Sequence, residues 1–215
     1  MYSETFIQNL NKQKLKSLKL NYRNISKNLE SLGYNVNDKN LSHHYLICSD
    51  NFNFKNILEL GTGSGEFTFF LSNRFKNSNI LTIDNYINKK DLSYPNKDIF
   101  KKKKKLKIKN IIFLKENTSI IKNFKKKYDF IFVDADHKFP NVNKDIINSL
   151  NILSKNGIML VDDIIMDNVK TNFASNSSYV FLEYLKTQKK IKVDYIFKRI
   201  EKGAYTKYIA FVKNR

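Results

Sequence analysis

Five short apolar runs, separated by longer amphipathic stretches, constrain the fold of this chain more than any other feature. Each run is rich in β-branched and aromatic residues and nearly free of charge, which is typical of parallel strands covered on both faces. The stretches between them are long enough for helical crossovers. The runs are 56–60, 79–83, 110–114, 129–133 and 157–161, and the expected helices are 65–76, 96–107, 118–127 and 140–154.

Repeated strand–helix units predict an α/β fold with a doubly wound sheet. After them, 179–186 is expected to be helical, and 192–200 and 206–213 to form an antiparallel hairpin that completes a mostly parallel, seven-stranded sheet. Ahead of them, 3–32 predicts one or two helices ending near Gly33. We therefore expect an N-terminal helical cap over 1–50 and one domain over 51–215.

The composition excludes several classes of protein. With 215 residues and 41% hydrophobic side chains, the chain can bury a sizeable core, which excludes intrinsic disorder. Its one cysteine, Cys48, cannot form an internal disulfide, which fits a reducing compartment. No apolar run approaches the roughly 20 residues that span a bilayer, and the N-terminus lacks the features of a secretory signal. We expect a soluble, cytoplasmic protein with no membrane partner.

A formal charge of +19 would ordinarily suggest a nucleic-acid partner. However, only four of the 39 basic residues are Arg, the side chain that binds phosphate in a bidentate manner. Asn and Ile are abundant and Ala is scarce, as expected when AT-rich codons dominate a gene. Nucleic acid is therefore an open but not a favoured partner. The run Lys101–Lys105 is interpreted as a solvated helix face, with an anion-facing patch as the alternative.

A glycine-rich turn, Gly61-Thr-Gly-Ser-Gly65, leaves the first strand and opens a helix. Glycine permits positive φ and lets a ligand approach the backbone, and a helix N-terminus offers free N–H groups. Glu66 stands where the dinucleotide fingerprint has its third glycine, which weakens a nicotinamide interpretation, and no Walker lysine is present. Asp84 closes the second strand, where an acid can accept hydrogen bonds from ribose hydroxyls.

Carboxylates follow the fourth and fifth strands. Asp134, Asp136 and His137 come after one strand, and Asp162 and Asp163 after the other, so neighbouring strands would bring the acids together. Such a cluster repels itself unless a cation or proton compensates it, and an all-oxygen site suits Mg²⁺, Mn²⁺ or Ca²⁺ better than zinc. Alternatively, the first two acids cap the following helix and the acidic pair only begins a loop.

The glycine turn and Asp84 resemble those of class I S-adenosylmethionine-dependent methyltransferases, over about 56–163. The resemblance implies a Rossmann-like fold and S-adenosylmethionine as cofactor. It also implies that the turn receives the methionine part, that Asp84 holds the ribose and that Asn117 reaches the adenine region. The implied cofactor-binding residues are Glu59, Gly61, Thr62, Gly63, Gly65, Asp84, Asn117 and Asp134.

The D-x-D-H string and the later acidic pair resemble those of metal-dependent small-molecule O-methyltransferases, above all the macrocin-type branch and a bacterial D-x-D-H family. Catechol-type enzymes carry Lys where His137 stands. The resemblance implies that Asp134, Asp162 and Asp163 bind Mg²⁺ or another divalent cation, and that His137 or Asp136 is the catalytic base. The implied reaction is methyl transfer to a hydroxyl of a small acceptor such as a sugar or polyol.

Two other functions stay open. An RNA methyltransferase would suit the charge and the Gly65-Glu-Phe string, which resembles tRNA guanine-N7 enzymes, but their proline-tryptophan motif is absent here. A cofactor-binding subunit without catalysis is the other. His43 and His44 are interpreted as surface or capping residues, with the active-site mouth as the alternative, and 166–178 as a substrate loop. The oligomeric state, including a homodimer, stays open.

Overall fold

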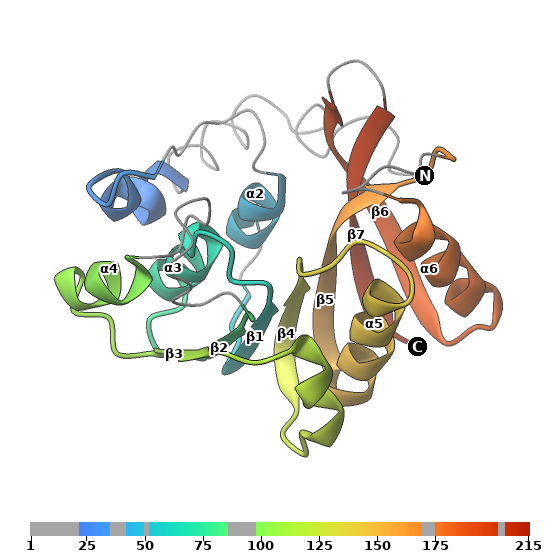
Figure 1. Cartoon of the computed structure of the whole chain (residues 1–215), viewed down its shortest axis with the longest axis horizontal. Coiled ribbons are helices and arrows are strands. Elements are labelled where there is room, and N and C mark those ends of the chain that lie inside the picture. Colours follow the sequence, from blue (N-terminus) through green and yellow to red (C-terminus); the bar gives the residue numbers. More distant parts are fainter. Residues whose placement is uncertain (1–21, 35–41, 50–51, 86–97, 169–174, 202–204) are drawn as a thin grey trace.

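A computed structural model describes residues 22–34, 42–49, 52–85, 98–168, 175–201 and 205–215 of the chain (Figure 1). Within them, seven strands form one sheet in the order β3-β2-β1-β4-β5-β7-β6. β1 to β5 run parallel, and β7 runs antiparallel to both of its neighbours, which confirms the predicted sheet and its C-terminal hairpin. The strands are β1 (Asn56–Leu60), β2 (Asn79–Ile83), β3 (Ile111–Leu114), β4 (Tyr128–Val133), β5 (Leu153–Ile165), β6 (Ile191–Glu201) and β7 (Tyr205–Asn214).

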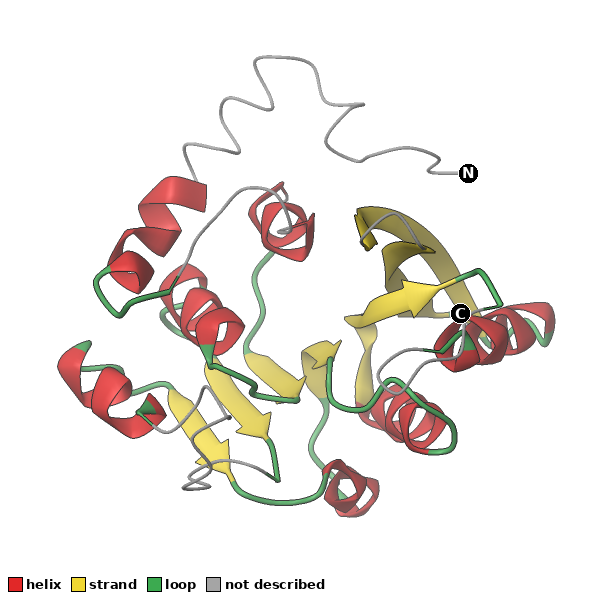
Figure 2. Cartoon of the chain, turned by 45° about the horizontal axis from the view of Figure 1, so that its top comes forward, coloured by secondary structure: helices red, strands yellow, loops and turns green. Residues whose placement is uncertain are grey.

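Helices cover both faces of the sheet (Figure 2). A helix over 22–30, α2 (Ser42–Ser49), α3 (Glu66–Arg74) and α4 (Ile99–Lys105) contribute to the hydrophobic cluster on one face. On the other face, the cluster includes side chains of the 3-10 helix η2 (Thr118–Asn123), α5 (Asn141–Ile152) and α6 (Ser177–Thr187). The doubly wound arrangement follows, because a parallel sheet is stable only when both faces are covered.

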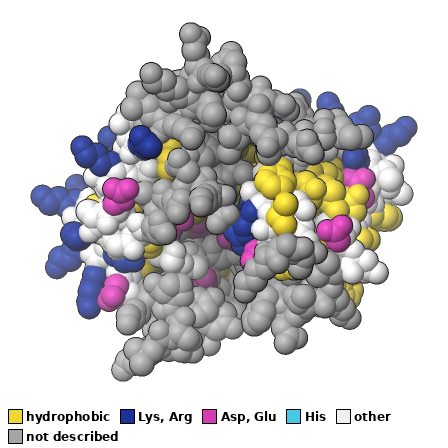
Figure 3. All heavy atoms as spheres, turned by 90° about the horizontal axis from the view of Figure 1, so that it is seen from above, with side chains coloured by type: hydrophobic (Ala, Val, Ile, Leu, Met, Phe, Trp, Pro, Cys, Tyr) yellow, Lys and Arg dark blue, Asp and Glu magenta, His cyan; other side chains and the backbone are white. Residues whose placement is uncertain are grey.

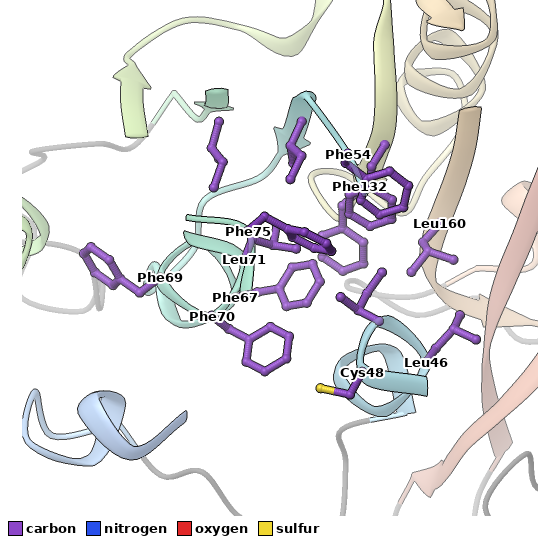
Figure 4. Packing of buried hydrophobic residues seen from close by; sticks show 14 of the residues in the cluster. Leu46, Cys48, Phe54, Phe67, Phe69, Phe70, Leu71, Phe75, Phe132 and Leu160 are labelled. Carbon is purple, nitrogen blue, oxygen red and sulfur yellow. The ribbon is translucent and has the colours of Figure 1, made fainter. Parts of the chain in front are cut away.

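Aromatic side chains fill the core between the sheet and α2 and α3 (Figure 4). The ring centroids of Phe67 on α3 and Phe132 on β4 are 4.4 Å apart, and Phe54 stacks on Phe130 at 5.1 Å. Full burial of each such ring stabilises the fold by on the order of 2 kcal/mol. This packing fixes α2 and α3 over the carboxyl end of β4, where the acidic residues begin.

Two predicted elements differ from the structure. The helix expected over 118–127 is only η2, and Phe124 after it is already extended. Ile121 is the one buried side chain of η2, so a longer helix would have no apolar stripe to bury. The helix expected over 140–154 ends at Ile152, because β5 begins at Leu153 and is longer than the apolar run 157–161 predicted.

Only part of the expected N-terminal cap is described. The helix over 22–30 ends before Gly33, as predicted, and Gly33 adopts a φ of 80° that suits glycine. The rest of the expected helices before residue 22 and the parts 169–174 and 202–204 of the substrate loop and hairpin turn lie outside the described residues. The division at residue 50 stays a prediction. In the described part, no helix combines the length and the apolar character that crossing a bilayer requires.

Candidate active site

A cavity of about 580 Å³ opens at the carboxyl ends of β1, β2 and β4. This is the edge where parallel α/β sheets bind their ligands. Seven of the residues predicted for the site line it together, from both the glycine turn and the loop after β4. They are Gly61, Gly63, Asp84, Asn117, Asp134, Asp136 and His137.

The glycine turn passes very close to the end of β4. Gly61 has a φ of 92°, and a Cβ placed on it would lie 2.1 Å from the carbonyl oxygen of Asp134. Only glycine therefore allows the backbones of the two loops to meet there. Gly63 also has positive φ, 49°, but a Cβ there would meet no atom within 4 Å. The first glycine is required for space and conformation, and the second for conformation alone.

Asp84 holds the turn in place from the end of β2. Its Oδ2 accepts hydrogen bonds from the backbone N–H groups of Thr62 and Gly63, at 3.0 and 3.1 Å. The hydroxyl of Thr62 lies 2.6 Å from that of Thr82 on β2. Thr62 therefore anchors the turn and is not among the residues that line the cavity, and its predicted contact with the cofactor stays a prediction.

Glu59 and Gly65 also lie beside the cavity without lining it. Glu59 is buried, accepts a hydrogen bond from Thr68 on α3, and has its pKa raised to about 8, mainly by loss of solvation. A Cβ on Gly65 would lie 2.6 Å from Cδ1 of Ile99 on α4. Glu59 joins β1 to α3, and Gly65 makes room for α4, while their predicted position on the methionine side stays a prediction.

The loop after β4 contains the candidate bases. Both carboxylate oxygens of Asp136 accept hydrogen bonds from its own loop, from Lys138 N at 3.0 Å and from Asn141 Nδ2 at 2.8 Å. Lys138 precedes α5 and Asn141 Nδ2 is a side-chain donor, so neither bond caps a backbone N–H of the helix. Nε2 of His137 lies 3.5 Å from Oδ1 of Asp134, and the hydroxyl of Ser175 donates to the His137 carbonyl at 3.0 Å.

The paired histidines of α2 are buried, so the prediction of surface or capping residues is wrong. The ring of His43 stacks on Phe132, 5.4 Å away, and Nε2 of His44 lies 3.0 Å from Oε1 of Glu66. Burial, and then His44, Lys198 and Arg199, lower the pKa of His43 well below its usual value. The reason is the aromatic core described above, into which α2 inserts both rings.

Lysines from β6 and β7 contact the acidic pair at the end of β5. Nζ of Lys198 lies 2.5 Å from Oδ2 of Asp162 and 2.8 Å from Oδ1 of Asp163. Nζ of Lys207 lies 2.5 Å from Oδ2 of Asp163. Both lysines are buried, with 8% of each residue exposed. Neither lysine was predicted from the sequence, because lysine is abundant throughout the chain and neither residue belongs to a spaced motif.

These contacts shift the ionisation of the cluster. Loss of solvation alone would raise the pKa of Asp163. The charge and hydrogen bond of Lys198, together with the hydrogen bond of Lys207, lower that pKa instead. Although burial acts the other way, Asp162, Asp163 and Asp134 raise the pKa of Lys198. Desolvation first, and then Asp162, raises the pKa of Asp134 well above its usual value. The acidic pair and the lysines are therefore mutually compensated.

The predicted metal ligands do not fit a divalent cation as they lie. Two lysine ammonium groups hold three of the four carboxylate oxygens of Asp162 and Asp163. Among the residues that the structure describes, no group of three or more His, Cys, Asp or Glu side chains is arranged to hold a metal ion. The sequence predicted a metal cation beside these acids. In the structure, lysine ammonium groups lie there instead.

Comparisons with known proteins agree with this geometry. A family described as "Methyltransferase domain" matches residues 58–164. No curated protein sequence matches the chain significantly.

Solved structures share the fold at low sequence identity. The O-methyltransferase TomG from Streptomyces achromogenes, in complex with SAM, has 12% identity and a TM-score of 0.64, over 99% of this chain and 100% of that one. An O-methyltransferase from Bacillus cereus, in complex with SAH, has 14% identity and a TM-score of 0.61, over 97% and 100%. An rRNA methylase from Streptococcus thermophilus has 12% identity and a TM-score of 0.58, over 84% and 99%.

The family match begins in β1 and ends in β5, so it contains the glycine turn, Asp84, the loop after β4 and the acidic pair. These are the elements that form the cavity and its neighbouring cluster. Residues 58–164 therefore form a methyltransferase domain, and the protein is a methyltransferase.

Proposed function

We propose that this protein transfers the methyl group of S-adenosylmethionine to a hydroxyl oxygen of a small polar molecule. The observation that supports this proposal most is that one cavity is lined both by residues predicted to bind the cofactor and by residues predicted to act on the acceptor. Gly61, Gly63 and Asp84 line one part of it, and Asp134 and His137 line another. A donor bound along the first set would present its methyl group toward the second.

The donor part of the cavity is lined by backbone and polar side chains that suit the cofactor. Asp84 is the ribose-binding residue in this proposal, and its bonds to the turn fix the acid and the glycines relative to each other. Asn117 lies at the far end, where its Oδ1 accepts from Ser119 N at 2.8 Å and begins η2. We assign it to the adenine region. When bound, S-adenosylmethionine supplies an electrophilic methyl group on a positively charged sulfur.

The acceptor part needs a group that takes the hydroxyl proton. Both oxygens of Asp136 are engaged by its loop, so His137 is the better base of the two predicted candidates. Asp134 lies 3.5 Å from His137 Nε2 and would hold a proton on that nitrogen, which leaves Nδ1 to accept the proton of the acceptor. Orientation by a carboxylate of this kind is the usual way to fix the tautomer of a histidine base.

The polar lining favours a hydroxylated acceptor over a flat aromatic one. Beside the candidate base, Lys138, Asn141 and Lys144 also line the cavity. These groups offer hydrogen bonds to several oxygens at once, as a sugar or polyol requires. The Mg²⁺ that the sequence predicted has no step in this mechanism, because the lysine-bound acids do not fit it.

Binding of the product S-adenosylhomocysteine tests the donor assignment. We expect measurable affinity by isothermal titration calorimetry, reduced about 10- to 100-fold in Asp84→Asn, because the variant loses the negative charge facing the turn and the ribose. Asp194→Asn is the matched control, since Asp194 is exposed on β6. The same affinity in both variants would contradict the role of Asp84, and no binding to the native protein would contradict the proposal.

Turnover tests the acceptor assignment. Incubation with isotopically methyl-labelled S-adenosylmethionine and a panel of sugars, polyols and catechols should label a polyhydroxylated compound. His137→Gln should lower that turnover by about 100-fold or more while S-adenosylhomocysteine still binds. Label transfer to RNA alone would replace this function with the alternative below, and no transfer despite cofactor binding would favour a non-catalytic subunit.

RNA methylation is the second candidate, and the charge of +19 is the observation that favours it. On the face shown in Figure 3, Lys and Arg side chains lie on both flanks with Asp and Glu side chains among them. A phosphate backbone would need them along a continuous track. RNA binding that falls steeply with salt concentration would support this candidate.

A further inference from the structure

Two β-bulges bring the acidic pair and Lys198 together. On β5, Val161 pairs with Ala210 and Ile164 with Tyr208, so Asp162 and Asp163 stand opposite a single residue of β7. Successive side chains of a regular strand point to opposite faces. The bulge, with Asp163 at a φ of 50°, removes that alternation and lets both carboxylates reach the same ammonium group.

The second bulge lies on β6. Phe197 pairs with Tyr208 and Arg199 with Lys207, so Lys198 is the extra residue of its strand. Its side chain crosses β7 to reach β5, two strands away in the sheet. A buried lysine that spans a neighbouring strand is costly unless its charge is matched. The acidic pair matches it.

Lys207 completes the cluster from the strand in between. It pairs with Ile165 of β5 and its Nζ reaches the second oxygen of Asp163. Two positive charges therefore face the two negative charges of Asp162 and Asp163. The Oδ1 atom of Asp162 remains buried without a hydrogen-bond partner among the described residues. The pair is thus neutralised by side chains of the same chain.

A divalent cation would compete with these lysines for the same oxygens. Mg²⁺ and Ca²⁺ bind carboxylate oxygens at about 2.1 and 2.3–2.6 Å, close to the distances at which the ammonium nitrogens lie. A metal on these oxygens would therefore lie within van der Waals range of Nζ of Lys198, and like charges so close repel strongly in a buried site. Cation and lysines cannot share the cluster.

We propose that Lys198 and Lys207 are the resident cations of this acidic cluster and replace the divalent metal, so that the site works without one. Lys198 is a positioning residue: it holds Asp162 and Asp163 beside Asp134 at the acceptor end of the cavity. The inference deepens the proposed function, on which it rests for the reaction, although the absence of a metal requirement can be tested without turnover.

Manganese is the probe for the test, because free Mn²⁺ is measured directly by its electron paramagnetic resonance signal. The native protein should bind no Mn²⁺ saturably in the millimolar range. Lys198→Ala should gain saturable Mn²⁺ binding in that concentration range, because the acids lose their compensating charge. Lys192→Ala, an exposed lysine on the same strand, is the matched control and should behave as the native protein.

Two further variants keep the test decisive. If Lys198→Ala does not fold, Lys198→Met keeps most of the buried volume, and Lys207→Ala removes only the second cation. Adding Asp163→Asn to the lysine variant should abolish the gained Mn²⁺ binding, which locates it at the cluster. Saturable Mn²⁺ binding by the native protein that Asp163→Asn removes would overturn the proposal.

The absence of Mn²⁺ binding in every folded lysine variant would also overturn it, since lysine would then not be what excludes the metal. S-adenosylhomocysteine binding, measured on the same samples with EDTA, keeps the two proposals apart. Its absence from the native protein both with and without EDTA would count against the proposed function and leave the Mn²⁺ result standing, whereas its loss only on addition of EDTA would overturn the metal-free inference. Its survival with EDTA, together with gained Mn²⁺ binding in Lys198→Ala, is the expected result.

Discussion

The donor half and the acceptor half of the cavity are built in different ways. In the donor half, β1, β2 and their turns are held by backbone geometry and by hydrogen bonds over about 20 residues of sequence, such as those of Asp84 to the glycine turn. In the acidic cluster beside the acceptor half, Lys198 reaches Asp162 across 36 residues and a neighbouring strand. Local geometry therefore forms one half, and long-range charge pairing forms the cluster beside the other.

The largest expected effect is a break in the donor half. Gly61→Ala should destabilise the protein by about 3 kcal/mol or more and abolish cofactor binding, because its Cβ would collide with backbone atoms of Asp134 that cannot yield. Gly63→Ala is the matched control and should cost about 1 kcal/mol, since only its positive φ opposes alanine. Urea unfolding measures both. Equal losses would mean that conformation, and not space, decides at Gly61.

The next largest effect is the pH dependence of stability that comes from Glu59, the buried acid of β1 beneath the glycine turn. The pKa of Glu59 is raised from 4.5 to about 8, so the folded state binds its proton more tightly than the unfolded state. This contribution to stability is complete below pH 4.5 and is lost as the pH rises through 8, by up to about 1.4 kcal/mol per pH unit.

Glu59→Gln should flatten that dependence. Unfolding free energies at pH 5.5 and pH 8 should differ less in this variant than in the native protein, whereas Glu116→Gln, at an exposed position, should leave the difference unchanged. Other buried acids, such as Asp145 with a pKa near 6, contribute equally to both proteins and cancel in the comparison. An unchanged slope in Glu59→Gln would contradict the assigned pKa.

The smallest effect concerns the lysines of α4, which lie on the donor side. They differ from Lys198 in how much they contribute to the free energy of unfolding. Nζ of Lys103 donates to the Ile111 carbonyl at 2.7 Å, so Lys103→Ala should cost about 1 kcal/mol. Lys101 is 86% exposed and pairs only with Asp98, at 3.3 Å, so Lys101→Ala should cost less than about 0.5 kcal/mol. Thermal unfolding of both variants checks the order, and a reversal would show that exposure does not rank these lysines.

The sequence predicted the donor half better than the acceptor half for the same physical reason. Hydrophobic runs and a glycine turn are local signals, and β1, β2 and α3 formed where those signals lie. The contacts of Thr62 with Thr82 and of Glu59 with Thr68 were not predicted, since the direction of a side chain depends on partners that no spacing reveals.

The acceptor half depends on partners that the sequence does not mark. Asp162 and Asp163 were predicted to follow the fifth strand, but both lie within β5, which extends to Ile165, and a metal was predicted where Lys198 and Lys207 lie. Bulges on β5 and β6 decide that pairing, and a bulge changes which face a side chain occupies without a clear signature in the sequence. His43 and His44 were misjudged similarly, because an amphipathic pattern does not show which aromatic cluster a helix will meet.

The contact between Gly61 and the carbonyl of Asp134 has a thermodynamic consequence. Because the two loops touch through backbone atoms, a shift of one on filling the donor site must be transmitted to the other. Binding free energies that are coupled in this way are reciprocal: whatever the donor adds to the affinity for the acceptor, the acceptor adds to the affinity for the donor. The absence of a side chain at Gly61 thus allows the backbone contact that would couple the affinities for donor and acceptor in the proposed reaction.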